Sequence, residues 1–167
     1  MALKSVRFIS LLSTALLAGL LFCHALELPN KMKLDAASWL TVQQVLYNLF
    51  GPVASVIEPV AIVSTLALLV MARGRRLAFA LTFLASLCLV AHLAEWFAVV
   101  DPVNRELNVW TQASMPADWT RARDRWEYGH AAGAALAIAA LVALILATLA
   151  DTPPARPPEA GGIRARP

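Results

Sequence analysis

Each of the three histidines in this chain has a glutamate three residues away. The pairs are His24 with Glu27, His92 with Glu95, and Glu127 with His130, and a fourth glutamate, Glu58, stands alone. Residues three positions apart share a face of a helix, so each pair presents an imidazole and a carboxylate to the same neighbour. Ionisable side chains inside a membrane helix are costly and usually functional. The pattern therefore predicts a metal or redox site within a helical bundle.

The composition is typical of an integral membrane protein. The 167 residues are 59% hydrophobic and 15% charged, against about 25% charged residues in a typical soluble domain. The formal net charge of +3 does not indicate nucleic-acid binding, because the basic residues are scattered at the ends of apolar stretches. The expected partners are the lipid bilayer, a lipophilic small-molecule substrate or quinone, and other subunits of a membrane complex.

Four apolar stretches reach the length of about 20 residues that spans a bilayer. They predict an all-α fold, a four-transmembrane-helix bundle formed by residues 1–151. The predicted spans are residues 8–28, 53–72, 77–100 and 130–150, and the loops 29–52 and 101–129 form a cap of short helices. The first stretch lacks a small-residue cleavage site, so it is expected to be a retained anchor. The proline-rich residues 152–167 are predicted to be a disordered cytoplasmic tail.

The loop at residues 73–76 predicts the orientation. Short arginine-rich loops stay in the cytoplasm, so both termini are expected there, in a bacterial inner membrane, with the cap outside. Within the cap, Asp35 is expected to begin a short helix that stops at Gly51-Pro52, and a further helix is expected to run from near Asp118 into the fourth span.

All seven histidines and glutamates of this pattern fall within about 15 Å of the outer boundary, at 1.5 Å of rise per helical residue. The candidate metal ligands are His24, Glu58, His92, Glu95, Glu127 and His130. Weaker candidates, or residues that would orient the ligands, are Glu27, Ser55, Asn104, Trp110 and Trp126. Di-metal carboxylate bundles use a similar set of glutamates and Glu-x-x-His pairs. Mixed imidazole and carboxylate ligands favour iron, then zinc or copper.

Other interpretations stay open at this point. Each pair is also compatible with a structural hydrogen bond or a proton relay. A non-enzymatic alternative is a small subunit of a membrane complex, or an electron carrier that binds haem or a quinone. Cys23 and Cys88 lie in apolar stretches and are expected to be buried thiols, which form a disulfide only if their two helices touch there.

Part of the chain resembles a family of small four-span membrane proteins that includes the fungal anthrone oxygenases. The resemblance is carried by residues 102–110, 118–119 and 125–130. Members tend to have Asn-x-x-Leu-x-x-Trp after the third span and Trp-x-x-x-His at the start of the fourth. Here the matching residues are Asn104, Leu107 and Trp110, then Trp126 and His130. The resemblance implies an oxygenase-like oxidoreductase that oxidises a lipophilic substrate with O₂ and needs no added cofactor.

Overall fold

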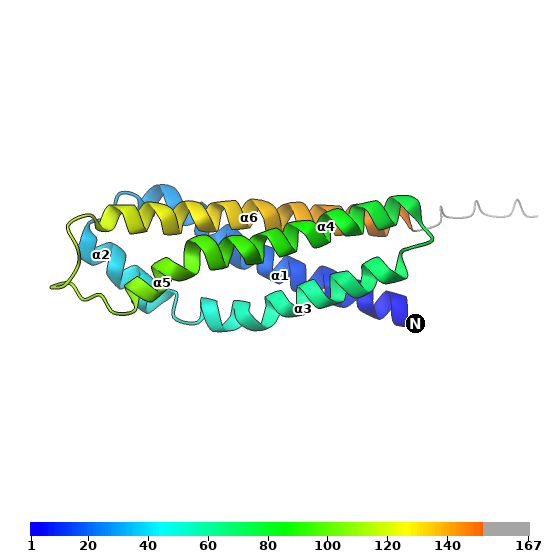
Figure 1. Cartoon of the computed structure of the whole chain (residues 1–167), viewed down its shortest axis with the longest axis horizontal. Coiled ribbons are helices and arrows are strands. Elements are labelled where there is room, and N and C mark those ends of the chain that lie inside the picture. Colours follow the sequence, from blue (N-terminus) through cyan, green and yellow to red (C-terminus); the bar gives the residue numbers. More distant parts are fainter. Residues whose placement is uncertain (152–167) are drawn as a thin grey trace, which may run out of the picture.

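The computed structural model describes residues 1–151, in which every regular element is a helix (Figure 1). In chain order the helices are α1 (Ala2–Lys31), α2 (Ala36–Thr41), the π-helical turn η1 (Val42–Leu46), α3 (Phe50–Met71), α4 (Arg76–Glu95), the π-helical turn η2 (Trp96–Val100), α5 (Asp101–Leu107) and α6 (Trp119–Ala150). Among the described residues, four helical stretches are long and apolar enough to cross a membrane: α1, α3, α4 continuing to α5, and α6. The predicted four-helix membrane bundle is confirmed, and the predicted disordered tail lies outside the described residues.

The four long helices form a closed ring. Helix α1 packs against α3 and α6, and α4 packs against the same two helices from the other side. The N-terminus of α1, the α3–α4 loop and the C-terminus of α6 meet at one end, where Arg7 and Arg75 both form ion pairs with Asp151. We call this the terminal end. The elements α2, η1 and α5 gather at the opposite end, the cap end (Figure 1).

Small side chains allow the helices to approach closely in the terminal half. Ala137, Ala140 and Leu144 of α6 are completely buried, and they share one core cluster with Ala61 of α3 and Ala85 of α4. Their spacing of three or four residues places the α6 members on one face of the helix. Because alanine adds only a methyl group to the backbone, the facing helices come within direct packing distance.

Two expected helix boundaries are wrong, for the same physical reason. The Gly51-Pro52 stop lies in the first turn of α3, and Asp101-Pro102, expected to begin a loop, opens α5. Proline is tolerated in the first turn of a helix, because its missing N–H has no helical partner there. The third span therefore continues through η2 to Leu107 rather than ending at residue 100.

Two expected helix starts are confirmed. The Asp35 carboxylate accepts a hydrogen bond of 2.8 Å from the backbone N–H of Ser38, as an N-cap of α2 should. This hydrogen bond holds the pKa of Asp35 below its usual value. Helix α6 begins directly after Asp118 and continues without a break to Ala150. Trp126, Glu127 and His130 therefore lie on one continuous helix.

Candidate functional site

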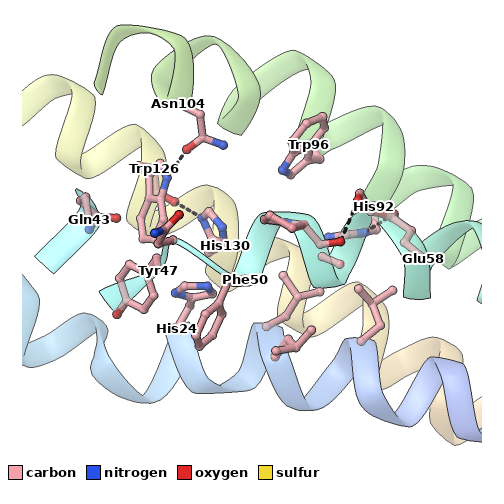
Figure 2. Close-up of a pocket in the computed structure, with 18 of the residues that line it drawn as sticks. His24, Gln43, Tyr47, Phe50, Glu58, His92, Trp96, Asn104, Trp126 and His130 are labelled. Atoms are coloured by element: carbon pink, nitrogen blue, oxygen red, sulfur yellow. Dashed lines mark hydrogen bonds and ion pairs between the residues drawn. The ribbon is translucent and has the colours of Figure 1, made fainter. Parts of the chain in front are cut away.

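A pocket of about 740 Å³ lies between the four long helices at the cap end. This volume is within the range of small-molecule sites, about 300–1,000 Å³. Four of the six predicted ligands line it, one from each long helix: His24, Glu58, His92 and His130 (Figure 2). Most of the remaining wall is apolar or aromatic. Four of the six residues that the sequence pattern grouped therefore share one pocket, and Glu95 and Glu127 do not reach it.

Glu58 and His92 form a hydrogen-bonded pair in the pocket wall. The distance between Glu58 Oε1 and His92 Nδ1 is 2.7 Å, and the two residues are only 7% and 3% exposed. With Glu58 ionised, Nδ1 is the donor and Nε2 carries the lone pair. Gly133 of α6 supports the ring, because a Cβ atom there would lie 2.8 Å from His92 Cδ2. The pair is thus fixed from both sides.

His24 and His130 meet at the other end of the pocket. Their ring centroids are 4.4 Å apart. The Trp126 carbonyl lies 2.9 Å from His130 Nδ1 and accepts its hydrogen bond, and the Trp126 ring lies tilted by 36° against the imidazole, with 3.9 Å between the ring centroids. The His24 ring is enclosed by the rings of Tyr47, Phe50 and Trp126.

The Nδ1 atom of His24 is buried and makes no hydrogen bond to any residue in the range 1–151. Buried polar atoms are nearly always satisfied, so an exception in a pocket wall indicates a place for a ligand or a water molecule. His130 directs Nδ1 to its own helix, which leaves Nε2 with a lone pair. The two imidazoles therefore offer the pocket hydrogen-bonding positions that the protein itself does not use.

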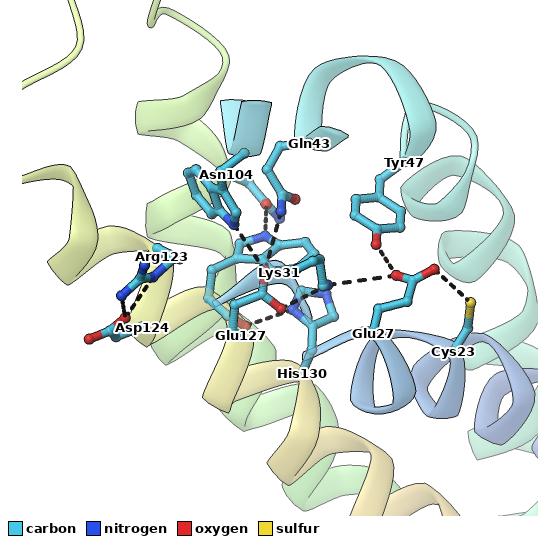
Figure 3. A network of polar contacts seen from close by, with 12 residues as sticks. Cys23, Glu27, Lys31, Gln43, Tyr47, Asn104, Arg123, Asp124, Glu127 and His130 are labelled. Atoms are coloured by element: carbon cyan, nitrogen blue, oxygen red, sulfur yellow. Dashed lines mark hydrogen bonds and ion pairs between the residues drawn. The ribbon is translucent and has the colours of Figure 1, made fainter. Parts of the chain in front are cut away.

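Glu127 lies outside the pocket and is held by the cap (Figure 3). Its Oε2 is 2.7 Å from Lys31 Nζ, and its Oε1 accepts hydrogen bonds from Trp39 Nε1 at 3.0 Å and Gln43 Nε2 at 3.4 Å. Lys31 and Glu127 are 4% and 1% exposed. The ammonium group also lies 4.7 Å from the Trp126 ring centroid. Glu127 thus joins α1, α2, η1 and α6.

Glu27 also connects helix α1 to the cap, at the edge of the same network. It accepts a short hydrogen bond from the Tyr47 hydroxyl and a weaker one from the Cys23 thiol, and Lys31 Nζ lies 3.8 Å away. Burial, together with the hydrogen bond to this carboxylate, raises the pKa of Tyr47 well above its usual value. The two carboxylates around Lys31 therefore hold the segment that follows α1 against the bundle.

Glu95 faces a different place again. It borders a shallow hollow with Arg125, Tyr128 and Gly129 on the outer side of α4 and α6. Its Oε1 is buried and has no hydrogen-bond partner among the described side chains. The Glu95 carboxylate packs against Gly129, where a Cβ atom would lie only 3.0 Å from Oε1. His92 and Glu95 share a helix, but they point to opposite sides of the α4–α6 contact.

The six predicted metal ligands therefore occupy three separate places: the pocket, the Lys31 ion pair and the outer hollow. Within residues 1–151, no three histidine, cysteine, aspartate or glutamate side chains are grouped closely enough to hold a metal ion. The arrangement does not fit the full ligand set, and a site for iron, zinc or copper stays a prediction. A haem held between His24 and His130 has no support either, because those two rings contact each other.

The weaker candidates divide in the same way. Ser55, Asn104 and Trp126 line the pocket, and Trp126 Nε1 donates a hydrogen bond of 2.8 Å to Asn104 Oδ1. Trp110 instead packs against the buried aromatic cluster of the cap. Cys23 and Cys88 are free thiols in the described part of the chain, and both are half-buried rather than buried.

Sequence reasoning missed the residues that neutralise or hydrogen-bond the carboxylates of Glu27 and Glu127. They are Lys31, Trp39, Gln43 and Tyr47. One signal was present, since Lys31 follows Glu27 by four residues and shares its helical face. The partners on α2 and η1 left no such signal, because they reach the carboxylates only through the fold of the cap.

Comparison of this chain with protein-family models, with curated proteins and with solved structures finds no match. The resemblance to the anthrone oxygenase family therefore stays a prediction, and the argument for function rests on the pocket.

Proposed function

We propose that this protein is an integral membrane oxidoreductase of the oxygenase-like kind. It oxidises a lipophilic aromatic substrate with an acidic O–H or C–H group in the cap-end pocket. The observation that carries the proposal is the 2.7 Å hydrogen bond between Glu58 and His92 in the wall of a largely apolar cavity. A carboxylate that orients an imidazole is the usual arrangement of a general base.

The chemistry assigned to the pair is removal of a proton. Glu58 accepts the Nδ1–H bond, so Nε2 of His92 takes the proton from the substrate, and the carboxylate stabilises the imidazolium that forms. The substrate becomes an electron-rich delocalised anion, which O₂ then oxidises. For an anthrone, the methylene carbon becomes a carbonyl: one O₂ is consumed, and one water is released with the anthraquinone. The proton that His92 removes leaves in this water, so the imidazole is neutral again at the end of the cycle.

The opposite end of the pocket supplies the recognition. His24 Nδ1 and the lone pair of His130 Nε2 are available to a substrate hydroxyl group, and the rings of Tyr47, Phe50 and Trp126 surround His24. Aromatic walls favour a flat ring system, because stacked and edge-to-face contacts add to the burial of apolar area. The family resemblance points to the same substrate class, and the cap is assigned to the outer side of a bacterial inner membrane on the arginine-rich loop alone.

The test uses purified protein in lipid nanodiscs, with anthrone as the substrate and O₂ consumption as the readout. Glu58→Gln keeps the size of the side chain but removes its charge. We expect O₂ uptake to fall by about 10²-fold or more, the usual contribution of a general base. Glu95→Gln is the matched control: it makes the same change on a carboxylate outside the pocket and should retain activity. Full activity in Glu58→Gln, or none in the wild type, contradicts the proposal.

A metal centre at His24 and His130 is the second candidate, favoured by the unpartnered Nδ1 of His24. Elemental analysis of folded, monodisperse protein decides between the two. A metal site requires bound metal in the wild type that is lost in His24→Ala and His130→Ala and kept in Glu127→Gln. If the metal content of these variants equals that of the wild type, including none in any of them, this candidate is wrong. Quinone binding without turnover would instead favour the electron-carrier alternative.

A further inference from the structure

The cap-end pocket has an open side between α3 and the η2–α5 segment. The pocket-lining residues that are exposed form a continuous stripe from η1 along α3: Gln44, Asn48, Gly51, Pro52, Ser55 and Pro59. Gly51, Ser55 and Pro59 are spaced four residues apart on α3 and share one helical face, whereas Gln44 and Asn48 precede that helix. Across the opening stand Phe97, which is 57% exposed, and the exposed Asn108. We call this opening the mouth of the pocket.

Small residues keep the mouth open. The α3 side of the rim carries glycine, proline and serine, whereas the neighbouring face of the same helix carries the large exposed residues Val53, Val56 and Val60. A Cβ atom built on Gly51 meets no described atom within 4 Å. The valines follow the pattern of a lipid-facing surface, and the small residues beside them line the pocket on the side where α3 faces η2.

The depth of the mouth places most of it within the apolar part of the bundle. Helix α3 has 22 residues, so it is roughly 33 Å long, close to the thickness of a bilayer core. Ser55 and Pro59 lie about 7 Å and 13 Å from its cap-side end at 1.5 Å per residue. Glu58, the acidic member of the general-base pair, is at the same depth as the inner end of the mouth.

The top of the pocket is bridged on the side of the cap. Gln44 of η1 donates hydrogen bonds of 2.9 Å to the carbonyl oxygens of Leu107, the last residue of α5, and of Trp110, which follows that helix. On the adjacent side, Glu127 holds Trp39 and Gln43, and Glu27 holds Tyr47. The cap is thus attached to the bundle at several points, while the flank between α3 and η2 carries no such bridge among the described residues.

From this difference we infer that the mouth is a lateral entrance from the lipid, through which a membrane-dissolved polycyclic aromatic substrate reaches the Glu58–His92 pair. The inference rests on the proposed function and names the source of its substrate. A flat ring system passes edge-first between Ser55 and Phe97 and meets His92 before His24. The protein then responds to the concentration of substrate in the bilayer rather than in water.

The test measures binding rather than turnover, with anthraquinone as a probe that O₂ does not oxidise. Trp96 and Trp126 line the pocket, so quenching of tryptophan fluorescence in nanodiscs reports arrival of the probe. Ser55→Phe places a ring across the mouth and should slow association by about tenfold or more. Val56→Phe, the same ring on the adjacent lipid-facing position, should bind at the wild-type rate. Wild-type association in Ser55→Phe overturns the lateral entrance.

A second variant keeps the test decisive if Ser55→Phe does not fold. Gly51→Phe places a ring at another position of the mouth, where a Cβ atom meets nothing within 4 Å; it should slow association as Ser55→Phe does, and association at the wild-type rate would overturn the inference. The two proposals fail in different ways. Retained O₂ uptake in Glu58→Gln, with anthraquinone binding slowed by Ser55→Phe, defeats the proposed chemistry and leaves the entrance. Absence of anthraquinone binding in the wild type defeats both.

Discussion

The two halves of the bundle are built from the same four helices but place polar groups of different size between them. In the terminal half, Thr82 donates to Ala78 O at 2.7 Å within its own helix, and Ser10 and Thr65 share a hydrogen bond of 2.7 Å across α1 and α3. In the cap half, the cross-helix pairs are larger, as where Glu58 binds His92. Small hydroxyl side chains permit close packing of the helices, whereas a carboxylate bound to an imidazole holds them apart around a cavity.

The difference shows why the pocket lies at one end only of the described bundle. Alanines fill the α6 interface in the terminal half, and imidazole and indole rings take the equivalent positions toward the cap. Helix α6 still packs closely on α4 toward the cap, because Gly129 and Gly133 leave no room for a Cβ atom. The space between the helices at this end is lined by the larger rings of Trp126 and His130 rather than filled by alanines.

The largest expected effect is in the cap half, at the buried ion pair. Lys31→Met removes the partner of Glu127 and leaves a carboxylate that is 1% exposed without its cation. We expect a loss of about 3–5 kcal/mol in the free energy of unfolding, because breaking a buried ion pair strands the remaining charge. Denaturant titration in detergent, followed by circular dichroism, measures the loss.

The double variant Lys31→Met/Glu127→Gln provides the control for that prediction. It removes both charges, so it should recover a substantial part of the lost stability, since a neutral glutamine still accepts a hydrogen bond from Trp39. If the double variant is no more stable than Lys31→Met, the ion pair does not carry the coupling between the cap and the bundle.

An intermediate effect is expected where the two halves meet, at Gly133. A Cβ atom there would lie 2.8 Å from His92 Cδ2 and 3.0 Å from Nε2. Gly133→Ala should therefore cost about 1–3 kcal/mol through overpacking and displace the imidazole from Glu58. Gly19→Ala, in open space on α1, is the matched control and should be neutral or slightly stabilising. The melting temperature and the rate of O₂ uptake with anthrone should both fall for Gly133→Ala. If neither changes, Gly133 does not fix the His92 ring.

The smallest effect is expected at the terminal end. Asp151→Asn weakens the ion pairs with Arg7 and Arg75, whose side chains are 18% and 34% exposed. Partly exposed pairs contribute about 1 kcal/mol or less, so the melting temperature should fall only slightly and anthraquinone binding should stay unchanged. A large loss of binding would show that the two ends are coupled, contrary to the independence inferred from their packing.

Four of the six residues grouped from the sequence line one pocket, and the other two have different partners. The spacing of His24, Glu58, His92 and His130 placed all four at one level, and the pocket brings them together. The same spacing predicted that Glu95 and Glu127 belong to this site, but in the structure neither residue lines the pocket. Residues three apart on a helix share a broad face, but a narrow cavity accepts only part of that face. Here a difference of one turn decides between pocket, ion pair and outer hollow.

The sequence by itself determined the number of long helices, their order, and the end of the bundle where the ionisable residues gather, because hydrophobic length and helical rise are local properties. Only the tertiary structure decided which groups pair. Lys31 neutralises Glu127 from a helix 96 residues away in sequence, and Glu58 reaches His92 across the α3–α4 contact. These pairings follow from the rotation of each helix about its axis, which is set by side-chain packing against its neighbours and leaves no mark in any single segment.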